Sequence, residues 1–144
     1  MTLDFRSVRQ EVADRLRELP QDLYEGVVPD DEELKTSNGV VLPYNVLTWT
    51  NPIAERRNRG IMGVRKDLFA VTCTVHSISP DYDASIDVHM DVFNALTGFQ
   101  PTNASEMLPW GGFSMNTTTD KAKPTKYIHT QGFRMYINTI LELD

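Results

Sequence analysis

Residues 68–78 read LFAVTCTVHSI, and the chain continues as SPDYDASIDVHMDVFNALTG over residues 79–98. The first segment alternates apolar with polar side chains, which is the pattern of a strand with one buried face. Its apolar face carries Phe69, Val71, Cys73 and Val75. The second segment opens with Ser79-Pro80-Asp81 and closes with Thr97-Gly98, the start and stop signals of a helix. Together they predict a helix packed on a sheet.

The helix predicted within residues 80–98 has a wide apolar surface. One polar stripe, formed by Asp87, Asp91 and Asn94, runs along it at about 100° per residue. Apolar residues occupy most of the remaining circumference, an arc wider than one sheet face can cover. We therefore expect a second partner for this helix, either another helix of the chain or another subunit.

The N-terminal segment predicts a second amphipathic helix, which begins at Asp4 and ends before Pro20. Further strands are predicted at residues 40–50, where Pro43 indicates a late start or a sheet edge, and near the C-terminus around residues 133–139. The predicted core consists of Phe5, Val8, Val12, Leu16, Phe69, Val71, Cys73, Val75, Val92 and Leu96. The expected fold is an α+β domain, a small mainly antiparallel sheet with two helices packed on one face.

The 144 residues suit a single domain over residues 1–144. Two connections, at residues 51–66 and 99–126, exceed the usual ~4–6 residues between elements. Prolines and glycines interrupt the second one, so we expect a long loop or arm at about residues 100–126 that becomes ordered on assembly. A short strand around Trp110 and Phe113 stays open as an alternative within it.

The composition excludes several classes of protein. Fourteen basic and twenty acidic residues give a net charge of −6, which argues against a surface built to bind nucleic acid phosphates. The single cysteine, Cys73, excludes an internal disulfide. No run approaches the ~18 apolar residues of a membrane span, and we expect neither membrane association nor an export signal.

Catalytic motifs are missing from the sequence, which has no phosphate-binding loop, no nucleophile elbow and no zinc-binding helix motif. The densest polar cluster contains Asp87, His89 and Asp91. On a helix, however, His89 points away from both carboxylates, so a solvated stripe is favoured over a metal site. His76 and His129 are interpreted as hydrogen-bonded polar residues. We predict no catalytic residue, no cofactor and no metal, and a small metal-dependent hydrolase is the remote alternative.

Charged loops suggest a contact between subunits. The basic loop carries Arg56, Arg57 and Arg59, and the densest acidic run is Asp30, Asp31, Glu32 and Glu33. A basic loop that binds the acidic loop of the next copy makes a head-to-tail contact, and such contacts can close into rings. A solvated loop without a partner is the other interpretation of this stretch.

The layout of these segments resembles that of tail terminator proteins of long-tailed bacteriophages. The N-terminal helix, the acidic run and Val41-Leu42-Pro43-Tyr44-Asn45-Val46-Leu47 carry the resemblance, as do residues 69–75 and the helix that leads to Ala95-Leu96-Thr97-Gly98-Phe99. The family has no catalytic residues to transfer.

The resemblance implies a virion protein at the tail–neck junction, assembled in the host cytoplasm as a homo-hexameric ring. Such a ring caps the tail tube, ends tube polymerisation and provides the surface for head–tail joining. The implied partners are the tail tube protein below and a head–tail connector or neck protein above, with DNA only in transit through the lumen. Another neck ring protein, a head–tail adaptor or stopper, is the alternative.

Overall fold

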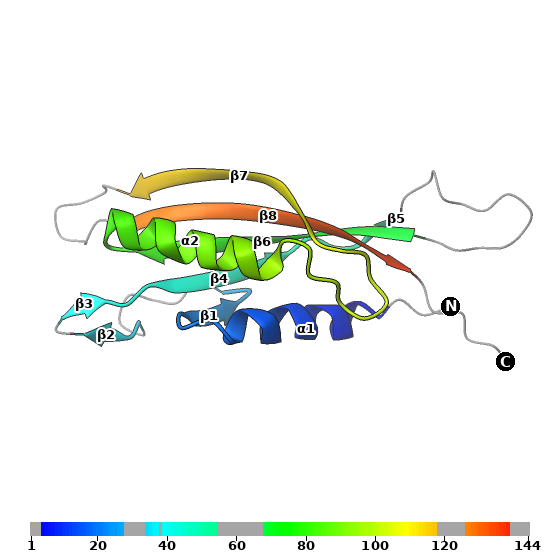
Figure 1. The fold of residues 1–144 in the computed structure, drawn as a ribbon, viewed down its shortest axis with the longest axis horizontal. Helices are drawn as coiled ribbons and strands as arrows, with labels where there is room; N and C mark the ends of the chain where they lie inside the picture. Colours follow the sequence, from blue (N-terminus) through cyan, green and yellow to red (C-terminus); the bar gives the residue numbers. More distant parts are fainter. Residues whose placement is uncertain (1–3, 28–33, 38, 55–67, 118–125, 139–144) are drawn as a thin grey trace, which may run out of the picture.

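The computed structural model describes residues 4–27, 34–37, 39–54, 68–117 and 126–138. They form two helices, one six-stranded sheet and one two-stranded sheet (Figure 1). The elements are α1 (Phe5–Arg17), β1 (Asp22–Glu25), β2 (Thr36–Ser37), β3 (Val40–Val41), β4 (Tyr44–Trp49), β5 (Ile53–Ala54), β6 (Leu68–Ser79), α2 (Tyr82–Leu96), β7 (Leu108–Thr117) and β8 (Lys126–Asn138). This is the expected α+β architecture.

The large sheet has the strand order β1-β4-β6-β8-β7, and β5 pairs with β6 beyond the end of β4. Only β1 and β4 run parallel, while every other neighbouring pair described in this sheet is antiparallel. The short strands β2 and β3 form a separate hairpin. In Figure 1 the long strands β6, β7 and β8 lie side by side, with α2 alongside them and α1 near β1.

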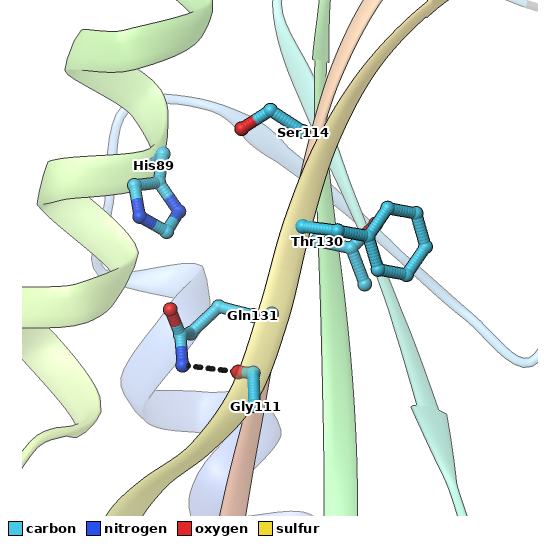
Figure 2. A pocket seen from close by; sticks show the side chains of 7 residues that line it. His89, Gly111, Ser114, Thr130 and Gln131 are labelled. Atoms are coloured by element: carbon cyan, nitrogen blue, oxygen red, sulfur yellow. Dashed lines mark hydrogen bonds between the residues drawn. The ribbon is translucent and has the colours of Figure 1, made fainter.

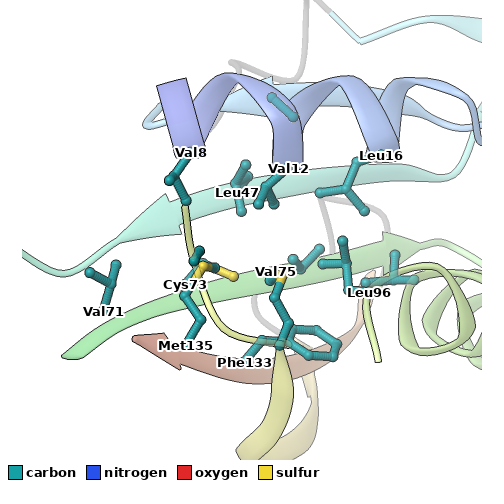
Figure 3. Close-up of a cluster of buried hydrophobic side chains, with 14 of the residues drawn as sticks. Val8, Val12, Leu16, Leu47, Val71, Cys73, Val75, Leu96, Phe133 and Met135 are labelled. Atoms are coloured by element: carbon teal, nitrogen blue, oxygen red, sulfur yellow. The ribbon is translucent and has the colours of Figure 1, made fainter. Parts of the chain in front are cut away.

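Both helices pack on the same face of the large sheet, as the sequence predicts. The core between the layers joins side chains of α1 and α2 to those of β4, β6 and β8 (Figure 3). Eight of the ten predicted core residues belong to it, namely Val8, Val12, Leu16, Val71, Cys73, Val75, Val92 and Leu96. Of the other two, Phe5 packs against its edge and Phe69 is half-buried.

The helix boundaries follow the sequence signals. Asp4 accepts a hydrogen bond from the Ser7 amide at 3.2 Å, and Asp81 caps α2 in the same way. Beyond the end of α2, Gly98 has a φ of +80°, which suits glycine. The second partner expected for α2 is α1, because Arg15 donates to the Ala95 carbonyl at 3.1 Å.

The opposite face of the sheet is covered only in part. A smaller buried cluster contains Leu34, Tyr44, Val46 and Ile78, with Tyr24, Val41 and Ile128 packed against it. The predicted late start at Pro43 is correct, since β4 begins at Tyr44. The alternative of a sheet edge is wrong there, because β4 lies between β1 and β6.

Four strands, β1, β2, β5 and β7, differ from the expectation. The loop expected at about residues 100–126 is wrong for residues 108–117, which form the ten-residue strand β7 beside β8. The alternative of a strand around Trp110 and Phe113 is correct there, although the strand is longer than expected. Residues 118–125 of the expected arm lie outside the described part of the chain. The short strands β1, β2 and β5 are also missing from the prediction, because two to four residues are too few to show an alternating pattern. Of these, β5 lies within the connection expected at residues 51–66.

A bulge bends β7 where its glycines stand. Pro109 pairs with Phe133 and Gly112 pairs with Gln131, so Trp110 and Gly111 together face Gly132. Gly111 has a φ of +69°. A Cβ on Gly132 would lie 2.1 Å from the Trp110 carbonyl oxygen, and only glycine leaves room for this close approach.

Candidate functional site

A polar cluster lies between β7, β8 and α2. His129 of β8 is only 8% exposed, and each of its ring nitrogens is close to a serine hydroxyl. The Ser114 Oγ lies 2.7 Å from Nδ1, and the Ser85 Oγ lies 3.0 Å from Nε2. The Ser85 hydroxyl donates its hydrogen to the Tyr82 carbonyl at 2.6 Å.

These contacts assign the direction of each hydrogen bond. A serine hydroxyl has one hydrogen, and that of Ser85 is used for the Tyr82 carbonyl. Ser85 therefore accepts from the Nε2–H of His129. In the tautomer that carries its hydrogen on Nε2 alone, Nδ1 accepts from the Ser114 hydroxyl. The prediction that His129 is a hydrogen-bonded polar residue is confirmed, and the same holds for His76, whose Nδ1 lies 2.9 Å from the Thr130 hydroxyl.

A small cavity of about 270 Å³ lies beside this cluster, between α2 and β7 (Figure 2). His89 points into it from α2, and its ring stacks on that of His129 with centroids 5.4 Å apart. Burial lowers the pKa of His89 below its ordinary value, and the nearby His129 lowers this pKa further. On the strand side, the Gln131 amide donates to the Gly111 carbonyl at 2.8 Å.

A serine hydroxyl that donates to an imidazole nitrogen forms, with that histidine, the pair used in nucleophilic acyl transfer. In such triads a carboxylate orients the histidine and stabilises the imidazolium that forms. Here the orienting group is the neutral hydroxyl of Ser85, which supplies no such charge. The chain of hydrogen bonds instead connects the edge strand β7 through β8 to helix α2.

The acidic stripe of α2 does not assemble a metal site with the histidines. Asp87 is exposed, and Asp91 accepts a hydrogen bond from the Gln21 side chain at 3.0 Å. Within the part of the chain that the structure describes, no three histidine, cysteine or acidic side chains are grouped closely enough to share a metal ion. The stripe therefore has the solvated character that its spacing indicates.

The outer strand β7 presents an apolar surface to solvent. Leu108, Trp110 and Phe113 are 57%, 55% and 59% exposed, and no residue of Leu108–Thr117 is charged. Leu108, Trp110 and Phe113 lie on the sheet face turned away from the helices. Residues that pair across two strands point to the same face, and here Leu108 pairs with Arg134 and Phe113 with Thr130. The guanidinium of Arg134 stacks over the Trp110 ring at 4.5 Å. Among the described residues, no strand pairs with the outer side of β7.

The predicted subunit-interface residues are not placed by the structure. Arg56, Arg57 and Arg59 fall in residues 55–67, and the acidic run of Asp30, Asp31, Glu32 and Glu33 falls in residues 28–33, all outside the described residues. Their pairing stays a prediction. The apolar edge of β7 was missed, although an uncharged run with a tryptophan and a phenylalanine was a signal for it.

No protein-family model matches the chain, and no curated protein matches it. Neither helix in the described ranges is long and apolar enough to cross a membrane. The geometry of the polar cluster and of the β7 edge is therefore the basis on which a function can be assigned.

Proposed function

We propose that this chain is a structural protein of a bacteriophage virion, which forms a ring that caps the tail tube, ends tube polymerisation and provides the surface for head–tail joining. The observation that carries the proposal is the edge strand β7, with ten residues, no charge and three large exposed apolar side chains. Proteins that stay monomeric protect such edges with lysines, prolines in the strand or covering loops. Among the described residues, Pro109 and the bulge are the only such devices on β7, so the edge is suited to contact with another chain.

The fold supports the proposal through its two unlike surfaces. The helices cover one face of the sheet, while β7 exposes Leu108, Trp110 and Phe113 on the other face. A ring protein needs lateral surfaces that bind its copies and axial surfaces that bind other proteins. The resemblance to tail terminators in segment order is the second support, since a ring of that kind acts by geometry and needs no catalytic residues.

Capping of the tail tube depends on which surfaces of the terminator ring are complementary to the tube. The end of a stacked tube accepts a further ring of tube subunits unless a different protein covers it. A terminator ring matches the tube on one side only, so polymerisation stops there. The net charge of −6 suits a lumen through which DNA passes, because repulsion of phosphates keeps the duplex from adhering to the wall.

A head–tail adaptor or stopper of the neck is the second candidate, because it too would be a small, acidic ring protein without catalytic residues. It differs in what it binds. Only a terminator recognises the growing end of the tail tube, whereas an adaptor binds between the head and a tail already completed.

The test is the length of tail tubes polymerised from purified tube protein with and without this chain. We expect the wild-type chain to shorten the tubes and to be visible at one end of each by electron microscopy. Phe113→Ser on β7 should weaken this effect, and the matched control is Ile53→Ser, which removes an exposed apolar side chain (65% exposed) away from β7. Rings that leave tube length unchanged would favour the adaptor, and a monomer without effect on the tubes would contradict both candidates.

A further inference from the structure

The two outer strands of the large sheet, β1 and β7, lie at the same position along the strand direction. The registers of four successive strand pairs connect Tyr24 to Val46, His76, Thr130 and finally Phe113 in one row across the sheet. The next row joins Glu25 on β1 to Gly112 on β7 in the same way. The whole length of β1 therefore stands level with residues 112–115 of β7.

The directions of the two outer strands, β1 and β7, also allow them to pair between copies. β1 runs parallel to β4, and each later step, from β4 to β6, to β8 and to β7, reverses the direction. As a result, β7 runs antiparallel to β1. A rotation about an axis along the strands keeps strand direction, so β1 of a neighbouring copy would meet β7 as an antiparallel partner, the commoner kind of strand pair.

The side chains on the two edges are complementary. Tyr24 and Phe113 stand in the same row and on the same face, where a cross-strand pair of aromatic rings is favourable. Val27, two residues after β1, is 69% exposed. Because Glu25 stands level with Gly112, Val27 continues toward Trp110, which lies two residues before Gly112. The two carboxylates of β1 are already paired within the chain, Asp22 with Lys35 and Glu25 with Arg17, so they bring no unpaired charge to the uncharged β7.

We propose that β7 of one copy adds to β1 of the next copy as an antiparallel strand, with Phe113 opposite Tyr24, and that this contact joins the sheets of neighbouring subunits around the ring. The inference rests on the proposed function in one respect, that copies of the chain form a closed ring. It goes further by naming the two edges and their register.

The size of the contact explains why it would close into a ring. The three exposed apolar side chains of β7 offer on the order of 300 Å². A stable pair of proteins buries about 800 Å² on each partner. One such strand pair is too small to hold an isolated dimer, but in a ring every copy is held through both of its edges. The same surface also allows two β7 strands to pair with each other, which would give a symmetric dimer instead.

Disulfide trapping tests the pairing in the full chain. The double variant Phe113→Cys with Tyr24→Cys places two thiols in the proposed row, where cross-strand Cα distances suit a disulfide. The native Cys73 is fully buried, and burial raises the pKa of its thiol to about 12, so it does not compete in the folded protein. We expect oxidation to yield a series of covalent oligomers that ends at the closed ring.

The controls separate this pairing from others. Phe113→Cys with Glu25→Cys puts the thiols on opposite faces of the sheet and should leave the chains unlinked. If loss of the Tyr24 ring prevents folding, Asp22→Cys with Met115→Cys occupies the neighbouring row on the same face and should give the same series.

Three outcomes would overturn the inference. Covalent dimers from Phe113→Cys alone would show that β7 pairs with β7. Rings that form normally while neither matched pair cross-links would reject the edge pairing and leave the proposed ring intact. A chain that stays monomeric at every concentration would reject both.

Discussion

His89 links proton binding to the stability of the subunit. Its pKa is lowered in the folded protein, chiefly by burial, so the unfolded chain binds a proton more readily. The neutral form therefore contributes stability that is fully present above pH 6.5, and this stability is lost as the pH falls from there through the folded-state pKa. Burial lowers the pKa of His76 as well, so it adds to the effect with the same sign.

We expect the free energy of unfolding, measured with urea, to fall as the pH is lowered from 7 to 5. In His89→Gln this fall should be smaller, with a remaining part due to His76. An unchanged pH dependence in His89→Gln would mean that the imidazole is as well solvated in the folded subunit as in the unfolded chain.

Gly132 cannot be replaced by a residue with a side chain unless β7 moves. Because a Cβ there would lie 2.1 Å from the Trp110 carbonyl oxygen, Gly132→Ala should destabilise the subunit by about 1–3 kcal/mol, as overpacking does. Thr74→Ala, directly opposite Gly132 on β6, serves as the control. Equal unfolding free energies for Gly132→Ala and the wild type would contradict the close approach.

At the scale of elements, the core between helices and sheet can be tested by truncation. Val71 and Leu96 are both fully buried, on β6 and α2. Replacing either by alanine should lower the free energy of unfolding by about 2–4 kcal/mol, since a cavity is left behind. The exposed residues Val40 and Leu42 offer matched controls, for which alanine should change stability by about 0.5 kcal/mol or less. Near-neutral values at the two buried sites would contradict the packing of α2 on β6.

The elements that sequence reasoning predicted have long, regular patterns. The alternation over residues 68–78 and the capping signals at Asp4 and Asp81 are local, and β6, α1 and α2 follow them closely. For β7 the sequence predicts a loop, with only a short strand as the alternative, because Pro109 and the two glycines are the usual marks of a loop. Their positions become compatible with a strand only at a sheet edge with a bulge, which depends on β8 and is invisible along the chain.

The polar cluster shows the same limit for the site. Ser85, Ser114 and His129 are separated by many residues, and only the pairing of β7 with β8 and the packing of α2 bring them together. None of them belongs to a motif with fixed spacing. The sequence could therefore predict that His129 is hydrogen-bonded, but not that it connects the edge strand to a helix.

At the scale of the whole molecule, two kinds of contact between copies are proposed. The charged contact of Arg56, Arg57 and Arg59 with an acidic run stays a prediction from the sequence, and it should weaken with added salt. The edge contact of β7 is apolar and should persist. Salt titration of the assembled particle therefore indicates how far each contributes.

Sedimentation velocity of the purified chain tests the central claim, assembly through the β7 edge, most directly. We expect the wild type to sediment as a particle of six 16.4 kDa subunits, and Trp110→Ser with Phe113→Ser to sediment as a folded monomer. The matched double variant Ile53→Ser with Val40→Ser removes equally exposed apolar side chains elsewhere and should assemble like the wild type. A wild-type chain that sediments at 16.4 kDa at all concentrations, or a β7 double variant that still forms the particle, would contradict the account.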